Sequence, residues 1–121
     1  MGTNLDNLPE DVKKKIMDLQ NLQIQIQNLQ NQHNYLESQR RETDIAIEEL
    51  EKVGPDAVVY KSIGGIFVKS ERDKLLDEKK STKVSTEMRL KTVKQKEERS
   101  LQTFENMRKS IQADMKSGLS Q

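Results

Sequence analysis

The chain has 121 residues, of which 32% are hydrophobic, 3% are aromatic and 34% are charged, and its formal net charge is +1. So few bulky side chains exclude a thick globular core and favour a mainly α protein, a single domain over residues 1–121 whose long helices bury narrow apolar stripes. The near-neutral charge argues against nucleic acid as a partner, and the absence of Cys excludes disulfides and thiolate chemistry.

The sequence carries no signal for a membrane. The N-terminal segment MGTNLDNLPEDVKKK lacks the apolar core of a signal peptide, and no apolar run approaches the ~20 residues of a transmembrane helix. Met1-Gly2 begins a myristoylation pattern, but Asp6 stands where that pattern requires Ser or Thr. We therefore expect a cytoplasmic protein without a membrane partner.

Start and stop signals predict a first helix over about residues 8–53. Asn7 and Glu10 have the spacing of an N-terminal capping box, and Pro9 suits the first turn, where its missing N–H costs nothing. The run Val53-Gly54-Pro55 predicts the end of this helix, because glycine readily adopts the left-handed conformation of a C-terminal cap and proline cannot continue the helix.

Within this helix, apolar residues recur at the 3–4 spacing of a coiled-coil seam. Residues 20–34, QNLQIQIQNLQNQHN, have an unusual composition, since ten of the fifteen are Gln or Asn. The tract keeps the seam spacing, which favours a solvated helix face over aggregation-prone disorder. The fourteen seam positions, ten of them apolar, are Leu5, Leu8, Val12, Lys15, Leu19, Leu22, Ile26, Leu29, His33, Leu36, Arg40, Thr43, Ile47 and Leu50.

The stretch VVYKSIGGIFVKS, residues 58–70, predicts a β-hairpin over about residues 57–69, because β-branched and aromatic residues flank a Gly-Gly pair. Gly64-Gly65 can supply the two positive φ angles of a type I′ turn. This turn pairs Ile63 with Ile66 and Lys61 with Val68.

Apolar side chains should then lie on both faces of the hairpin. A lone two-stranded hairpin is marginal in water, and the helices offer little apolar surface to cover it. Hairpins of several chains should therefore pair edge to edge into a shared sheet or barrel. The residues of this expected interface are Val58, Val59, Tyr60, Ile63, Gly64, Gly65, Ile66, Phe67 and Val68.

A second helix is predicted over about residues 71–117, opened by the capping-box pattern Ser70-Glu71-Arg72-Asp73. Its seam is less regular. Residues 1–53 carry a net charge of −4 and residues 70–116 one of +4, which favours an antiparallel pair of helices. The second seam is Leu76, Lys79, Lys83, Thr86, Leu90, Val93, Glu97, Ser100, Phe104, Met107 and Ile111.

Aligning the helices about the hairpin predicts which charges meet. Glu42 and Asp44 should lie near Lys79-Lys80, where opposite charges attract. At the other end, Lys13–Lys15 should lie near Arg108-Lys109, and these like charges should loosen the helix ends.

The order helix, VYKSIGGIFVKS hairpin, helix, with heptads in both arms, resembles the β-type subunits of prefoldin, and is most similar to the archaeal form. The pattern Val59-Tyr60-Lys61 to Gly64, followed by a short apolar strand, is the specific part, and the resemblance covers about residues 8–116. It implies an ATP-independent chaperone subunit that is not an enzyme and has no cofactor. It further implies an α2β4 hexamer of α-type and β-type subunits that holds unfolded polypeptides at the coiled-coil tips and delivers them to a group II chaperonin.

The expected client-binding residues are the apolar ones at the helix ends farthest from the hairpin. Methionine is soft and adaptable, which suits contact with varied partners. The alternative is that these residues continue the seam, except for Ile16, Met17 and Met115, which lie beside it. The set is Leu5, Leu8, Val12, Ile16, Met17, Leu19, Met107, Ile111 and Met115, with Leu119 beyond it.

The sequence indicates no catalytic, metal-binding or phosphate-binding site. His33 is the only histidine and lies in the seam, and without Cys or a second His it cannot complete a typical metal site. Gly64-Gly65 lacks the spacing of a phosphate-binding loop. A structural coiled-coil tether remains the alternative function. Such a scaffold would dimerise along the seam of Leu19–Leu50 and tolerate loss of the hairpin.

Overall fold

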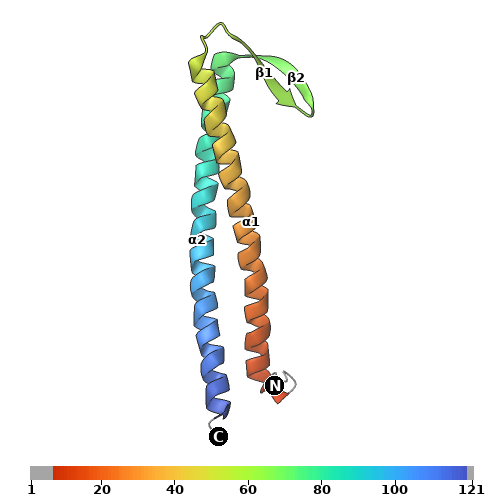
Figure 1. Cartoon of the computed structure of the whole chain (residues 1–121), viewed down its shortest axis with the longest axis vertical. Coiled ribbons are helices and arrows are strands. Elements are labelled where there is room, and N and C mark those ends of the chain that lie inside the picture. Colours follow the sequence, from red (N-terminus) through yellow and green to blue (C-terminus); the bar gives the residue numbers. More distant parts are fainter. Residues whose placement is uncertain (1–6, 120–121) are drawn as a thin grey trace. The chain divides into compact units, whose positions relative to one another are not determined.

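The computed structural model describes residues 7–119, apart from the side chain of Leu119. The element order is α1 (Glu10–Lys52), β1 (Val58–Ile63), β2 (Ile66–Glu71) and α2 (Arg72–Leu119), as Figure 1 shows. The prediction of two long helices with one antiparallel hairpin between them is confirmed, with each bound shifted by one or two residues.

The chain divides into two compact units, and each contains part of both helices. The terminal unit comprises the chain up to Gln32 and from Val93 onward, and the hairpin unit comprises His33–Thr92. Leu5 and the other residues before Asn7 lie outside the described part of the chain.

In the hairpin unit, α1 and α2 pack antiparallel along the predicted seam. Lys83 Nζ lies 2.9 Å from Asp44 Oδ1, and Lys80 Nζ lies 3.9 Å from Glu51 Oε1. Asp44 thus pairs one helical turn farther along α2 than predicted. Every seam position of this unit is buried or half-buried; the buried ones are Leu36, Thr43, Leu50, Leu76, Thr86 and Leu90, joined from beside the seam by Leu75.

In the terminal unit, the seam is again buried or half-buried, with Val12 and Ile111 among its most buried residues. Lys15 Nζ lies 2.6 Å from Asp114 Oδ2 and donates a 3.0 Å hydrogen bond to Ser110 Oγ. The predicted repulsion of Lys15 is therefore wrong, because its ammonium group faces a carboxylate of α2.

Both helices begin later than the capping boxes predict. The Lys13 N–H donates to the Pro9 carbonyl at 3.0 Å, so Pro9 rather than Asn7 provides the first acceptor of α1. At α2, Ser70 pairs with Val59 in the hairpin instead of capping the helix. Strand pairing continues up to the first residue of the helix and takes the place of the predicted cap.

The predicted conformation of the glycine that follows the C-terminus of α1 is wrong. Gly54 was expected in the left-handed conformation, but of the described residues only Gly64 and Gly65 have positive φ. The ring of Pro55 drives the preceding residue toward extended backbone. The Gly54 carbonyl instead accepts the N–H of Ala57 at 3.0 Å in a turn.

Candidate functional site

The hairpin turn has the predicted geometry. Gly64 and Gly65 have φ of 55° and 85°, as a type I′ turn requires. The register pairs Ile63 with Ile66 and Lys61 with Val68, so the predicted strand pairing is confirmed.

Two contacts attach the base of the hairpin to the helices of its unit. Val59 packs against the buried cluster of Leu50, Leu75 and Leu76. Lys61 Nζ lies 2.9 Å from Glu78 Oε2 on α2. The hydrogen bond from Lys61 lowers the pKa of the Glu78 carboxyl below its ordinary value of 4.5.

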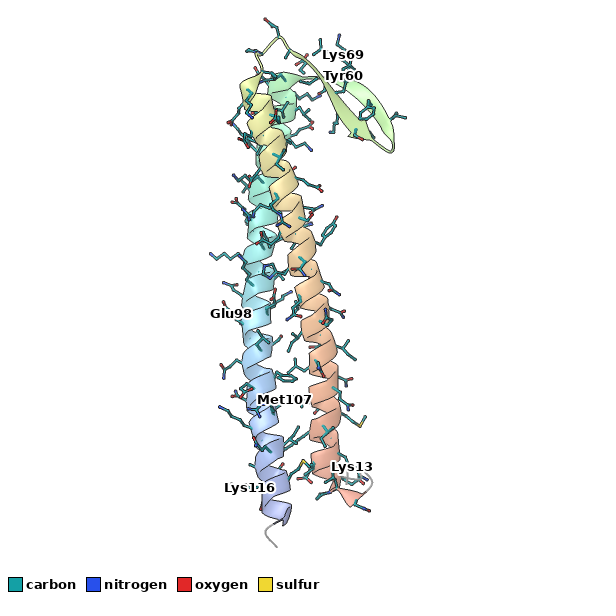
Figure 2. The ribbon with its side chains drawn as sticks, viewed as in Figure 1. Lys13, Tyr60, Lys69, Glu98, Met107 and Lys116 are labelled. Atoms are coloured by element: carbon teal, nitrogen blue, oxygen red, sulfur yellow. The ribbon has the colours of Figure 1, made fainter. Side chains whose placement is uncertain are left out.

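The rest of the hairpin is uncovered. Phe67 is 75% exposed, Ile66 63% and Tyr60 58% (Figure 2 shows Tyr60 on the strand pair). The sheet of this unit has only the two strands β1 and β2, so each keeps one unpaired edge. Apolar groups beside open edges form a template for pairing with another chain. We call these exposed residues the hairpin surface: Val58, Tyr60, Ile63, Ile66, Phe67 and Val68.

The described residues of the expected client-binding set differ in exposure and fall into three groups in the terminal unit. Val12 and Ile111 are buried in the seam and serve the packing of α1 against α2. Met17 is 61% exposed and offers most of its side chain to a partner. The others are half-buried and expose part of an apolar side chain: Leu8, Ile16, Leu19, Met107 and Met115.

A polar band interrupts the seam of the hairpin unit. Arg40 bonds Glu37 at 2.8 Å and approaches Asp44 at 3.7 Å, and Asp44 in turn meets Lys83. The hydrogen bond that Arg40 donates to Glu37 raises the pKa of Arg40, and the one that Lys83 donates to Asp44 raises the pKa of Lys83. Such partners favour the charged forms, so the band is ionic and fixes the pairing of the helices rather than offering a reactive group.

His33 belongs to the same part of the seam. Its Nε2 lies 3.7 Å from Glu37 Oε1. Over residues 7–119, the structure brings together no three His, Cys, Asp or Glu side chains that could hold a metal ion. Within that range, too, neither helix combines the length and apolarity needed to cross a bilayer.

Sequence reasoning assigned no role to several exposed apolar residues outside the seam. The signal that could have found them is an apolar residue one or two positions after a seam position, where a solvated helix normally carries charge. In the described chain they include Ile24, Tyr35, Ile45, Val84, Met88 and Leu101.

Comparison with known proteins agrees with this architecture. A family model described as "Prefoldin subunit" matches residues 13–118. The prefoldin subunit beta of Methanosarcina acetivorans is 32% identical over 105 residues, covering 87% of this chain and 90% of that protein. That of Archaeoglobus fulgidus is 33% identical over 108 residues, covering 89% of this chain and 93% of its own length.

A solved structure is similar over the same region. The crystal structure of the prefoldin beta subunit from Thermococcus strain KS-1 superposes with a TM-score of 0.78 at 29% sequence identity. The match covers 88% of this chain and 94% of that one.

Proposed function

Because this chain belongs to the prefoldin family, as a chaperone subunit of the beta type, we propose that it holds unfolded polypeptides in the cytoplasm and delivers them to a group II chaperonin, without ATP and without catalysing a reaction. Apart from membership of the family, the single observation that supports the proposal is the exposed apolar surface of the hairpin. It requires a covering partner, and a client-holding oligomer supplies one.

Assembly follows from the hairpin surface. Two apolar faces and two open edges are costly in water, and edge pairing with other hairpins would satisfy both. We propose that β-type and α-type prefoldin subunits assemble in this way into an α2β4 hexamer. The base of the hairpin is already fixed by Val59 and by the pair of Lys61 and Glu78, which presents the remaining surface in a defined direction.

Client binding is assigned to the apolar residues of the terminal unit. Met17 is the most exposed of the expected set, and Ile16 and Met115 lie beside the seam rather than in it. Side chains that the packing of α1 on α2 leaves partly free can contact a client without opening the unit. Several weak contacts from several subunits would add up through multivalency.

The test of client binding compares two matched double variants. Met17→Ser with Met115→Ser removes apolar surface in the terminal unit, while Val84→Ser with Met88→Ser removes exposed apolar surface in the hairpin unit. Aggregation of a denatured test protein diluted into buffer is followed by light scattering. We expect the first variant to lose most of the suppression and the second to retain it. Equal suppression by both would refute the assignment.

The test of assembly replaces residues 57–69 with a short flexible turn and measures mass in solution. We expect the oligomer to dissociate. A scaffold that dimerises along the seam would keep its mass. This alternative has less support, because Ile26, Leu36 and Leu50 of that seam are buried in packing within the chain itself.

A further inference from the structure

A long stretch of α1 carries no charge. From Leu19 to Leu36 there is no Asp, Glu, Lys or Arg, although 34% of the chain is charged. The part of this stretch up to Gln32 belongs to the terminal unit. Its seam residues face α2, and the remaining positions face solvent.

The outward positions form a continuous strip. They repeat at the helical spacing on the side opposite the seam, and every one of them is exposed. Two are apolar, Met17 and Ile24, each 61% exposed. We call this surface the amide strip: Met17, Gln20, Asn21, Ile24, Gln27, Asn28 and Asn31.

The outward side of α2 in the same unit is different. It carries both signs of charge, including Glu98 and Lys116, which Figure 2 labels, and Arg108 paired with Glu105 at 2.6 Å. A charged, internally paired face is the ordinary solvated side of a coiled coil. The amide strip therefore departs from what solubility alone requires.

Covering the two sides would cost different amounts of free energy. Charged groups must lose hydration when a partner covers them, and that loss is large unless each is paired. Side-chain amides exchange water for another neutral hydrogen-bonding partner at little net cost. In the described chain, the strip has one hydrogen bond between its own side chains, from Gln27 Nε2 to Asn31 Oδ1 at 3.2 Å, so its other amides remain available to a ligand.

The chemistry of the strip matches a polypeptide backbone. Each amide side chain presents a donor and an acceptor, as each exposed peptide group of an unfolded chain does. From Met17 to Asn31 the helix rises roughly 21 Å, which is about six residues of extended chain. An open groove of about 390 Å³ borders the strip, lined by Asn28 and Leu29 from α1 and by Lys96 and Ser100 from α2, among others.

We propose that the amide strip binds an extended, uncharged segment of a client polypeptide, with Ile24 as its apolar anchor and the amides as sequence-independent backbone partners. This inference rests on the proposed chaperone function and adds a second contact surface to it. Met17 belongs to both surfaces, so a client held by the terminal apolar residues would continue onto the strip without a break.

The test uses the native oligomer and two matched pairs of substitutions. Gln27→Glu with Asn31→Lys places an ion pair on the strip. Gln102→Glu with Asn106→Lys makes the same change on α2, where the two amides also form a 3.2 Å hydrogen bond. Because both changes create a favourable i,i+4 pair, neither should weaken its helix.

The probe is a fluorescein-labelled peptide of Gly, Ser, Asn and Leu with blocked ends, measured by anisotropy. We expect the strip variant to bind it roughly fivefold more weakly and the α2 variant to bind as the unmodified protein does. Ile24→Ser should weaken binding similarly, and the matched Leu101→Ser on α2 should not. Equal affinities for the strip variants and their controls would overturn the proposal.

The absence of Cys permits a direct check. Asn21→Cys and Asn106→Cys variants, each carrying a benzophenone, are irradiated with the same peptide. Cross-linking from position 21 in excess over position 106 is expected, and equal yields contradict the inference. Failure of the chaperone function itself is distinguishable, since the unmodified oligomer would then suppress no aggregation. Suppression that is lost in Met17→Ser with Met115→Ser, but unchanged both in Gln27→Glu with Asn31→Lys and in Ile24→Ser, overturns only the amide strip.

Discussion

Arg72 joins three parts of the hairpin unit through one guanidinium group. It follows β2 and begins α2, and its Nε donates to the Leu50 carbonyl near the end of α1 at 2.8 Å. The last four carbonyls of a helix lack partners within the helix, and a cation there also opposes the negative end of the helix dipole. Its side chain is only 17% exposed, so water cannot readily replace it.

We therefore predict that Arg72→Ala lowers the free energy of unfolding by about 1.5–3 kcal/mol, the range for a hydrogen bond that involves a charged group. Urea unfolding followed by circular dichroism measures this. Arg89→Ala, an exposed position of α2, is the control and should change stability by less than about 0.5 kcal/mol. Equal effects of the two substitutions would count against the capping role.

The pair of Lys61 and Glu78 makes attachment of the hairpin dependent on pH. The hydrogen bond from Lys61 lowers the pKa of Glu78, with smaller contributions from Lys74 and Lys79. A carboxyl whose pKa is lowered by folding stabilises the folded state above its ordinary value of 4.5, and this contribution is lost as pH falls through the lowered pKa.

We expect the amide resonances of β1, followed by NMR, to shift as pH falls through the lowered pKa of Glu78. The substitution Glu78→Gln should abolish this transition. Glu105 is a matched control, because its pKa is lowered by Arg108 within α2 alone. Glu105→Gln should leave the transition of β1 unchanged. A transition that persists in Glu78→Gln would assign it to another group.

At the scale of elements, the hairpin depends on two glycines because of their backbone conformation and not because of close packing around them. A Cβ added at Gly64 or Gly65 would meet no atom within 4 Å, but both residues have positive φ. Gly64→Ala and Gly65→Ala should each destabilise the hairpin by about 1 kcal/mol through backbone strain. Gly54→Ala should be neutral, because Gly54 also has open space but no positive φ. Thermal unfolding of the three variants distinguishes strain from crowding, since crowding predicts no effect at any of them.

Local patterns made these elements predictable. The 3–4 spacing identified seam residues that are all buried or half-buried over the described chain, including polar ones such as Arg40 and Lys83. The Gly-Gly pair fixed the register of the hairpin because a two-residue turn leaves one way to pair the strands. Both inferences depend only on residues close in the sequence.

Contacts between elements were not predictable in the same way. Arg72 contacts Leu50 across the hairpin, and no spacing in the sequence indicates that pair. Lys15 was expected beside the basic residues Arg108 and Lys109, but its ammonium group pairs with Asp114, farther along α2. The conformation of Gly54 was mispredicted because the restriction from Pro55 prevailed over the frequent use of glycine as a helix cap.

For the whole molecule, the division into two units suggests that local opening is separate in each. The hairpin unit has its own buried cluster around Leu75, and the terminal unit has Val12 and Ile111. In a narrow seam each side chain packs mostly against near neighbours. Truncating one seam side chain should therefore lower the stability of its own surroundings more than that of distant parts. The terminal unit, where we propose that clients bind, would thus loosen while the hairpin surface, which we propose for assembly, stays ordered.

This leads to a prediction with reciprocal controls. Ile111→Ala should cost about 2–4 kcal/mol and speed amide exchange in the terminal unit, with β1 and β2 unchanged. Leu75→Ala should cost a similar amount and speed exchange in the hairpin unit, because Val59 packs on the cluster it weakens. Val84→Ala, at an exposed position of α2, should affect neither. Hydrogen exchange read by mass spectrometry resolves the two units. Exchange that rises uniformly along the chain in both core variants would mean that the molecule opens as one cooperative body, and that client binding cannot be loosened independently of assembly.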